Sequence, residues 1–280
     1  MRAAVQWPHL PDAAVIIAFC GWNDAGDAAS DALEHVAELS HASDLLELDL
    51  SDFIDYQQIR PHILTNEQGE RAIEWPTVRI RTGRLHERNL ILIDADEPNY
   101  RWQQFADDLA RDLLALRPTA VIFLGSMLED VPHTRPTPVY GSSTNSELAA
   151  RTGFTPSTYE GPTGIVGVLS VAFAAVGLDV TSLWAGLPHY ISHAPSPKAV
   201  VALLNALEDV LETSIDVGDF LEQSRAWQRR CDELASEDEE LADYIRGLEA
   251  QHDDDSSMQA TGDAIAKEFE RYLRRRGEQT

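Results

Sequence analysis

Short apolar runs rich in β-branched residues alternate with longer segments of helical spacing up to about residue 215. Residues 13–20 and 119–125 are continuous apolar runs of the kind found in strands buried on both faces, whereas 27–39 and 101–118 repeat their apolar residues with helical period. Two further strand-like runs within 76–96 are joined through Gly83 and polar residues, which predicts a hairpin. We therefore predict an α/β fold with a mixed, largely parallel sheet flanked by helices.

Beyond residue 215 the sequence changes to helix formers and offers no strand candidate. We predict a core domain over 1–215 and an acidic, helical C-terminal extension over 216–280, with a mobile acidic linker near 251–260. Residues 232–255 hold eleven acidic side chains against Arg246, a pattern typical of the solvated face of an amphipathic helix. Ile265, Phe269 and Tyr272 form a later apolar stripe that either docks on the chain or binds a partner.

Charge and cysteine content exclude several functional classes. The 280 residues include 22 basic and 47 acidic ones, a net charge of -25 that repels nucleic-acid phosphates and anionic lipid. Only two cysteines occur, so no disulfide framework is expected and a reducing cytoplasm fits. The apolar run near the N-terminus is too short for a membrane anchor and lacks the basic flank of a signal peptide. We expect a cytoplasmic protein without a nucleic-acid or membrane partner.

Four loops contain several glycine, aromatic, charged and histidine residues. Each loop follows a predicted strand or precedes a predicted helix, which is the position where open α/β sheets bind ligands. The first contains Trp22, Asp24 and Gly26, and it is interpreted either as a pocket wall or as a capped turn before a helix. The second runs from Gly125 and Ser126 to His133 and Arg135. This combination suits acid/base chemistry or anion recognition, although its prolines also suit a rigid connector.

The third and fourth loops offer a different chemistry. Glu160, Gly161, Thr163 and Gly164 precede an apolar helix whose first amides could hold an anion, or whose glycines simply allow close packing. The fourth loop has His189 and Tyr190, but its prolines make a metal-binding pair with a second histidine improbable. The candidate pocket therefore comprises Trp22, Asp24, Gly26, Gly125, Ser126, His133, Arg135, Glu160, Gly161, Thr163, Gly164, His189 and Tyr190, and no metal or other cofactor is expected.

Four segments in this order, GWNDAGD, GSMLEDVPHTRP, YEGPTGIVGVL and SLWAGLPHYI, resemble the proteasome assembly chaperone 2 family, particularly its bacterial, actinobacterial branch. The resemblance covers about residues 3–215 and implies a fold similar to that of purine nucleoside phosphorylases, together with homo-oligomers, for which we expect a trimer. Relatives assist assembly of the proteasome α ring, and some dock through a C-terminal motif with a penultimate tyrosine. This chain ends Arg276-Gly277-Glu278-Gln279-Thr280, without that tyrosine.

Two functions from different classes follow from these features. The resemblance favours a non-enzymatic assembly or protein-interaction factor with proteasome subunits as possible partners. The alternative is a protein or enzyme that binds a nucleoside-like or other polar metabolite in a pocket at the carboxyl ends of the strands. Similar sequences have been labelled ATP-grasp or carboxylate-amine ligases, but this chain has only Lys198 and Lys267 and no glycine-rich nucleotide loop, so we do not expect that activity.

Overall fold

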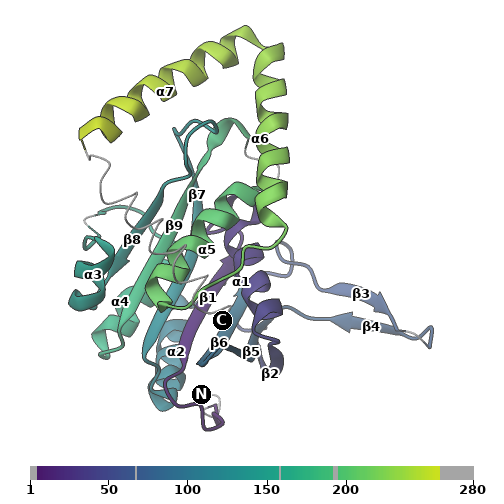
Figure 1. Ribbon diagram of the computed structural model, residues 1–280. Coiled ribbons are helices and arrows are strands. Elements are labelled where there is room, and N and C mark those ends of the chain that lie inside the picture. Colours follow the sequence, from purple (N-terminus) through teal and green to yellow (C-terminus); the bar gives the residue numbers. More distant parts are fainter. Residues whose placement is uncertain (1–4, 67, 158, 192–194, 259–280) are drawn as a thin grey trace.

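The computed structural model describes residues 5–66, 68–157, 159–191 and 195–258, with only the backbone from 254 onward (Figure 1). Seven strands form one sheet in the order β2-β5-β6-β1-β7-β9-β8. Their bounds are β1 Ala14–Cys20, β2 Ser43–Asp49, β5 Thr77–Leu85, β6 Arg88–Asp96, β7 Ala120–Glu129, β8 Val139–Ser143 and β9 Val180–Pro188. The neighbours among β6, β1, β7 and β9 pair in parallel, and the outer pairings are antiparallel. The predicted mixed sheet and the predicted hairpin are thus confirmed.

The sheet is buried on both faces because helices cover each of them (Figure 1). Strand β1 shows why its sequence is apolar throughout: Ala14 and Ile16 pack in one core cluster, and Val15 and Ile17 in the other. The first cluster includes residues of α1 Ala28–Leu39 and α5 Pro197–Leu211, and the second includes residues of α2 Trp102–Leu116 and α4 Ile165–Ala175. A shorter helix, α3 Ser146–Thr152, follows β8.

Two helices continue the chain past the core, α6 Phe220–Glu237 and α7 Glu239–Met258. Figure 1 shows α6 rising from the body and α7 turning back above the ends of β7 and β9. The acidic segment near 251–260 was expected to be a linker, but α7 is helical as far as Met258, and the rest of that segment lies outside the described residues. The apolar stripe of Ile265, Phe269 and Tyr272 also lies outside the described residues. Within the described ranges, no helix combines the length and apolarity needed to cross a bilayer.

Candidate functional site: the loops at the ends of β1, β7 and β9

The loop after β1 is built around the carboxylate of Asp24. One oxygen of this nearly buried side chain accepts the backbone N–H of Ala29 at 2.7 Å, and the other accepts the Ser30 hydroxyl at 2.5 Å. Burial raises the pKa of the Asp24 carboxyl. Asp24 therefore satisfies the free donors in the first turn of α1, which is the structural alternative that the sequence offered for this loop.

Loops one and two meet where β1 and β7 lie side by side. The Ser126 hydroxyl donates to the carbonyl of Ala25 at 2.8 Å, and the Ser126 N–H donates to the carbonyl of Asn23 at 2.9 Å. Gly26 adopts a left-handed backbone, with φ of 60°, and its carbonyl accepts the N–H of Ser196 at the start of α5. These bonds hold the first loop between β7 and α5.

The amino end of α4, where the sequence indicated an anion site, is filled by a carboxylate of the chain itself. Glu97, directly after β6, accepts the N–H of Ile165 at 2.8 Å and the side-chain amide of Asn23 at 3.0 Å. Gly164 leaves room for this contact, since a Cβ there would lie 2.9 Å from a Glu97 carboxylate oxygen and 2.6 Å from Asn23 Oδ1. The preceding residues Glu160, Gly161 and Thr163 are exposed.

Sequence reasoning missed Glu97, although its place directly after a predicted strand was a usable signal. The exposed ring of Trp22 lies beside the same helix end, with 69% of its surface open to solvent. Of the two interpretations that the sequence left open, an anion site or close packing around the glycines, the contacts support close packing around the carboxylate of Glu97, which stabilises the helix end through its dipole.

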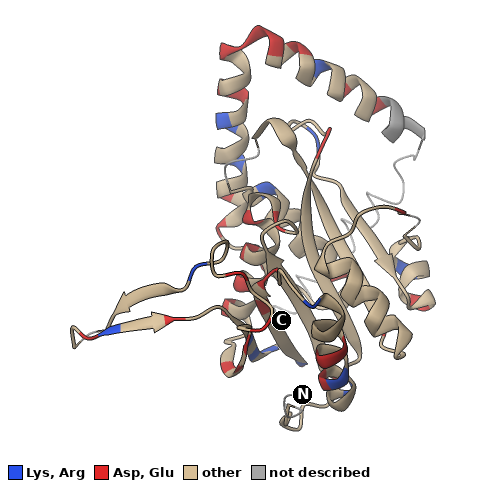
Figure 2. Cartoon of the chain, turned by 180° about the vertical axis from the view of Figure 1, so that it is seen from behind, with Lys and Arg blue, Asp and Glu red and all other residues tan. Residues whose placement is uncertain are grey.

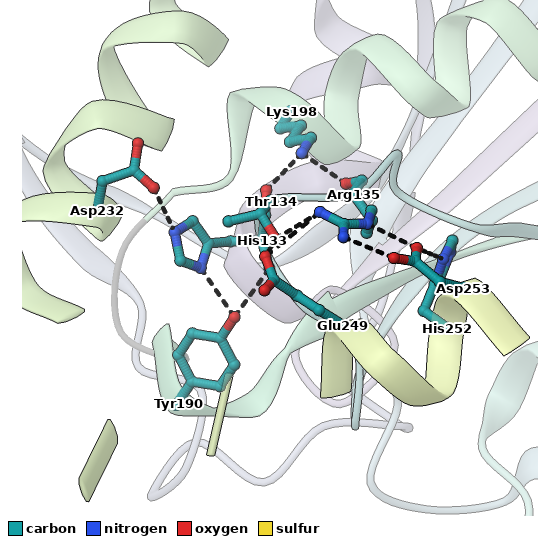
Figure 3. A network of polar contacts seen from close by, with 9 residues as sticks. All are labelled: His133, Thr134, Arg135, Tyr190, Lys198, Asp232, Glu249, His252 and Asp253. Carbon is teal, nitrogen blue, oxygen red and sulfur yellow. Dashed lines mark hydrogen bonds and ion pairs between the residues drawn. The ribbon is translucent and has the colours of Figure 1, made fainter. Parts of the chain in front are cut away.

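The second part of loop two meets loop four beside the C-terminal helices (Figure 3). His133 is 2% exposed; its Nδ1 lies 2.9 Å from the Tyr190 hydroxyl and its Nε2 lies 3.0 Å from Asp232 Oδ1 on α6. The Tyr190 hydroxyl also accepts the N–H of His133 at 2.8 Å. Both ring nitrogens of His133 are therefore engaged by side chains of the protein itself. Burial raises the pKa of Tyr190 to about 12, so the phenol stays protonated.

Arg135 fastens the same loop to α7. Its guanidinium forms two bonds of 2.8 Å to the carboxylate of Asp253 and one of 3.3 Å to Glu249, and Thr134 also bonds Glu249 (Figure 3). The Lys198 ammonium of α5 donates to the carbonyls of His133 and Arg135 at 2.5 and 2.6 Å. We call His133, Thr134, Arg135, Tyr190, Lys198, Asp232, Glu249 and Asp253 the latch. Three latch residues, His133, Arg135 and Tyr190, were predicted from the sequence. The acids of α6 and α7 were not predicted because their spacing is that of a solvated helix.

The four predicted loops therefore gather in two groups rather than around one pocket centre. Trp22, Asp24, Gly26, Ser126 and Gly164 lie at the ends of β1 and β7, while His133, Arg135 and Tyr190 belong to the latch. His189 pairs with Asp130 at 3.1 Å, and Asp130 also accepts the Tyr244 hydroxyl of α7. In the described part of the chain, no three His, Cys, Asp or Glu side chains are grouped to hold a metal ion.

Known proteins support the fold and the family. The model of the PAC2 family matches residues 18–235. The chain belongs to the PAC2 family. A PAC2 family protein from Streptomyces avermitilis is 42% identical, with a TM-score of 0.78 and coverage of 84% of this chain and 100% of that one. A proteasome-assembly chaperone homologue from Mycobacterium tuberculosis is also 42% identical, with a TM-score of 0.75 and coverage of 83% and 99%.

More distant structures share the PAC2 fold alone. PbaB, an archaeal proteasome activator from Pyrococcus furiosus, is 15% identical with a TM-score of 0.64, and the match covers 83% of this chain and 97% of that one. None of the curated proteins matches the chain. The family expected from the four motifs is thus confirmed, and its actinobacterial relatives include the Streptomyces and Mycobacterium proteins.

The thiol of Cys20 provides a test of the first loop. Cys20 is exposed at the end of β1, and the partial desolvation of its thiol together with the neighbouring Asp24 carboxylate raises the pKa of this thiol to about 12. A rise of about three pKa units lowers the thiolate fraction at pH 8 roughly 1000-fold. A thiolate of higher pKa is also the stronger nucleophile, and this recovers about half of the lost rate on a logarithmic scale. We expect iodoacetamide to alkylate Cys20 about 30-fold more slowly than an unperturbed cysteine peptide, with a rate that still rises above pH 10. Peptide mapping by mass spectrometry reports this site separately from Cys231, and a rate that is half-maximal near pH 9 and level above about pH 10 would contradict the raised pKa.

Proposed function

We propose that this PAC2 family protein is a non-enzymatic protein-interaction factor that assists the assembly of other proteins. The observation that carries the proposal is that three acid/base candidates are committed to internal contacts, while the carboxylate of Glu160 lies on an exposed loop. Asp24 satisfies the start of α1, His133 is buried between Tyr190 and Asp232, and His189 pairs with Asp130. A general acid or base must instead reach a proton on a bound substrate.

Proteasome subunits are the first partners to test, since the mycobacterial relative is named a proteasome-assembly chaperone homologue. The proposal includes a cytoplasmic homo-oligomer, with a trimer as the expected state. The outer face of α6 and α7 suits a basic partner surface because its acids, including Glu233 and Glu240, are exposed (Figure 2).

A groove between β8 and α5 supports a second candidate function, the binding of a polar metabolite. The groove has a volume of about 690 Å³, and its lining includes Tyr140, Phe154, Lys198 and Asn205. Lys198 contributes to both the groove and the latch, so the groove lies beside the latch. It does not lie among all four predicted loops. Aromatic walls with a few polar groups are typical of small-molecule sites.

Native mass spectrometry separates the two functions. The protein is measured alone and with proteasome α subunits from the same organism, and we expect a stoichiometric complex. Replacing Glu233 and Glu240 with lysine should abolish that complex. As a control, lysine at Asp107 and Glu147, two exposed acids on other helices, changes the net charge equally and should leave the complex intact. A bare oligomer that retains a small-molecule mass and binds no α subunit would overturn the proposal in favour of the metabolite.

A further inference from the structure

A two-stranded arm extends from the edge of the sheet between β2 and β5. It consists of β3 His62–Thr65 and β4 Arg71–Glu74, which pair antiparallel with Ile63 opposite Ile73. All eight strand residues are exposed, and both Figure 1 and Figure 2 show the arm standing clear of the body. A lone two-stranded ribbon is marginally stable in water, so this arm requires a surface to pack on.

One face of the arm is suited to burial in an interface. Ile63 and Ile73 are direct cross-strand neighbours, so they share a face, and they are 59% and 52% exposed. Trp75 follows β4 and is 51% exposed, with its ring edge-on to Tyr56 at 5.3 Å. Grouped large apolar side chains of this kind are typical of the centre of a protein interface.

Helix α4 offers a second apolar surface without a partner among the described residues. Residues 163–178 contain no charged side chain, in a chain whose net charge is -25. Val171 on this helix is 74% exposed and Val176 just after it is 43% exposed, while Ile165, Leu169 and Phe173 face the core. The exposed side of α4 is therefore a place where a second acidic molecule can approach without like-charge repulsion.

The arm and α4 lie toward opposite edges of the sheet. The arm leaves beside β2 at one edge, whereas α4 packs against α2 and β9, the strand next to the other edge. Among the described residues of the arm, Arg60 and Arg71 balance Glu70 and Glu74. One contact between the arm of one copy and α4 of the next would cover both apolar surfaces at once.

We propose that the arm of each protomer packs its Ile63–Ile73 face on the exposed side of α4 of a neighbouring copy. This contact joins two different surfaces, so repetition closes a ring when the rotation allows it, as in a trimer. The inference rests on the self-association in the proposed function and names the surfaces that produce it. An arm-to-arm dimer is the main competing arrangement, and it would leave Val171 in water.

Disulfide trapping distinguishes these arrangements. In a Cys20→Ser background, Ile73→Cys and Val171→Cys are made in two differently tagged chains, and Cys231 stays buried. We expect a covalent dimer when the two chains are mixed and oxidised, and little from either chain alone. An equal yield from Ile73→Cys alone would establish the arm-to-arm dimer instead, and no cross-link in any sample would overturn the proposed contact.

Sedimentation gives an independent measurement. Ile63→Asp with Ile73→Asp should weaken self-association at least about 30-fold and shift the mass toward the 31.0 kDa monomer. Val171→Glu should do the same, while Leu114→Asp, at an exposed position of α2, should not. Circular dichroism confirms folding of each variant. A wild-type monomer at about 10 μM would overturn this inference, whereas binding of proteasome α subunits is scored separately and tests only the proposed function.

Discussion

Replacing Gly125 with alanine is expected to destabilise the fold by about 1–3 kcal/mol, because the added methyl group meets an indole ring. Gly125 on β7 is aligned with Trp184 on the parallel strand β9, so side chains at both positions point to the same face. A Cβ at Gly125 would lie 2.7 Å from the nearest ring atom of Trp184. The absence of a side chain at this predicted pocket residue therefore serves packing between two central strands.

Urea unfolding followed by circular dichroism measures this loss of stability. In a Trp184→Leu background the same Gly125→Ala change should cost less than about 0.5 kcal/mol, since the clashing ring is gone. Gly247→Ala is the matched control: it lies in α7 with no atom within 4 Å of the added Cβ, and it should stabilise the helix by about 0.5–1 kcal/mol. An unchanged penalty without Trp184 would refute the steric explanation.

His133→Ala is expected to destabilise the protein by about 3 kcal/mol and to loosen α6 and α7. The substitution removes a buried ring that contacts Tyr190, Asp232 and Trp227. It leaves the Tyr190 hydroxyl without one of its partners, which costs about 1–3 kcal/mol, and it also creates a cavity. Hydrogen exchange of the α7 amides should accelerate because the loop that holds Glu249 and Asp253 is no longer fixed.

His189→Ala provides the comparison for this experiment. The half-exposed ring of His189 pairs with Asp130 and lies edge-on to Tyr190 and Tyr244, so its loss should change stability by about 1 kcal/mol, less than the loss of the buried His133. If the two variants unfold alike and α7 exchanges at the wild-type rate in both, His133 does not support the latch. In that case a role for His133 toward an external molecule would regain weight.

The latch explains why the second loop resembles an enzyme site in sequence. His133 and Arg135, within three residues, are a usual choice for acid/base or anion chemistry. Here the anion is the protein's own: Asp232 faces the imidazole, and Glu249 and Asp253 face the guanidinium. These contacts join residues about 100 to 118 positions apart in the chain, so no local spacing announces them.

The fold could be read from the sequence because its signals are local. Continuous apolar runs such as 13–20 require burial on both faces, and helical spacing over 101–118 requires a single buried face. The turn within 76–96 fixed one antiparallel pair, which the structure places as β5 and β6. The four loop motifs likewise identified the family before any contact was known.

Tertiary structure alone decided how the candidate residues are used. Glu97 occupies the amino end of α4, and Glu249 and Asp253 of α7 bind Arg135, because folding brings distant charges within hydrogen-bond distance. Sequence patterns report which side chains must leave water, but they do not report which distant partner a polar group will meet. That choice depends on the packing of the whole chain, since a buried polar group takes whichever partner the assembled fold places beside it.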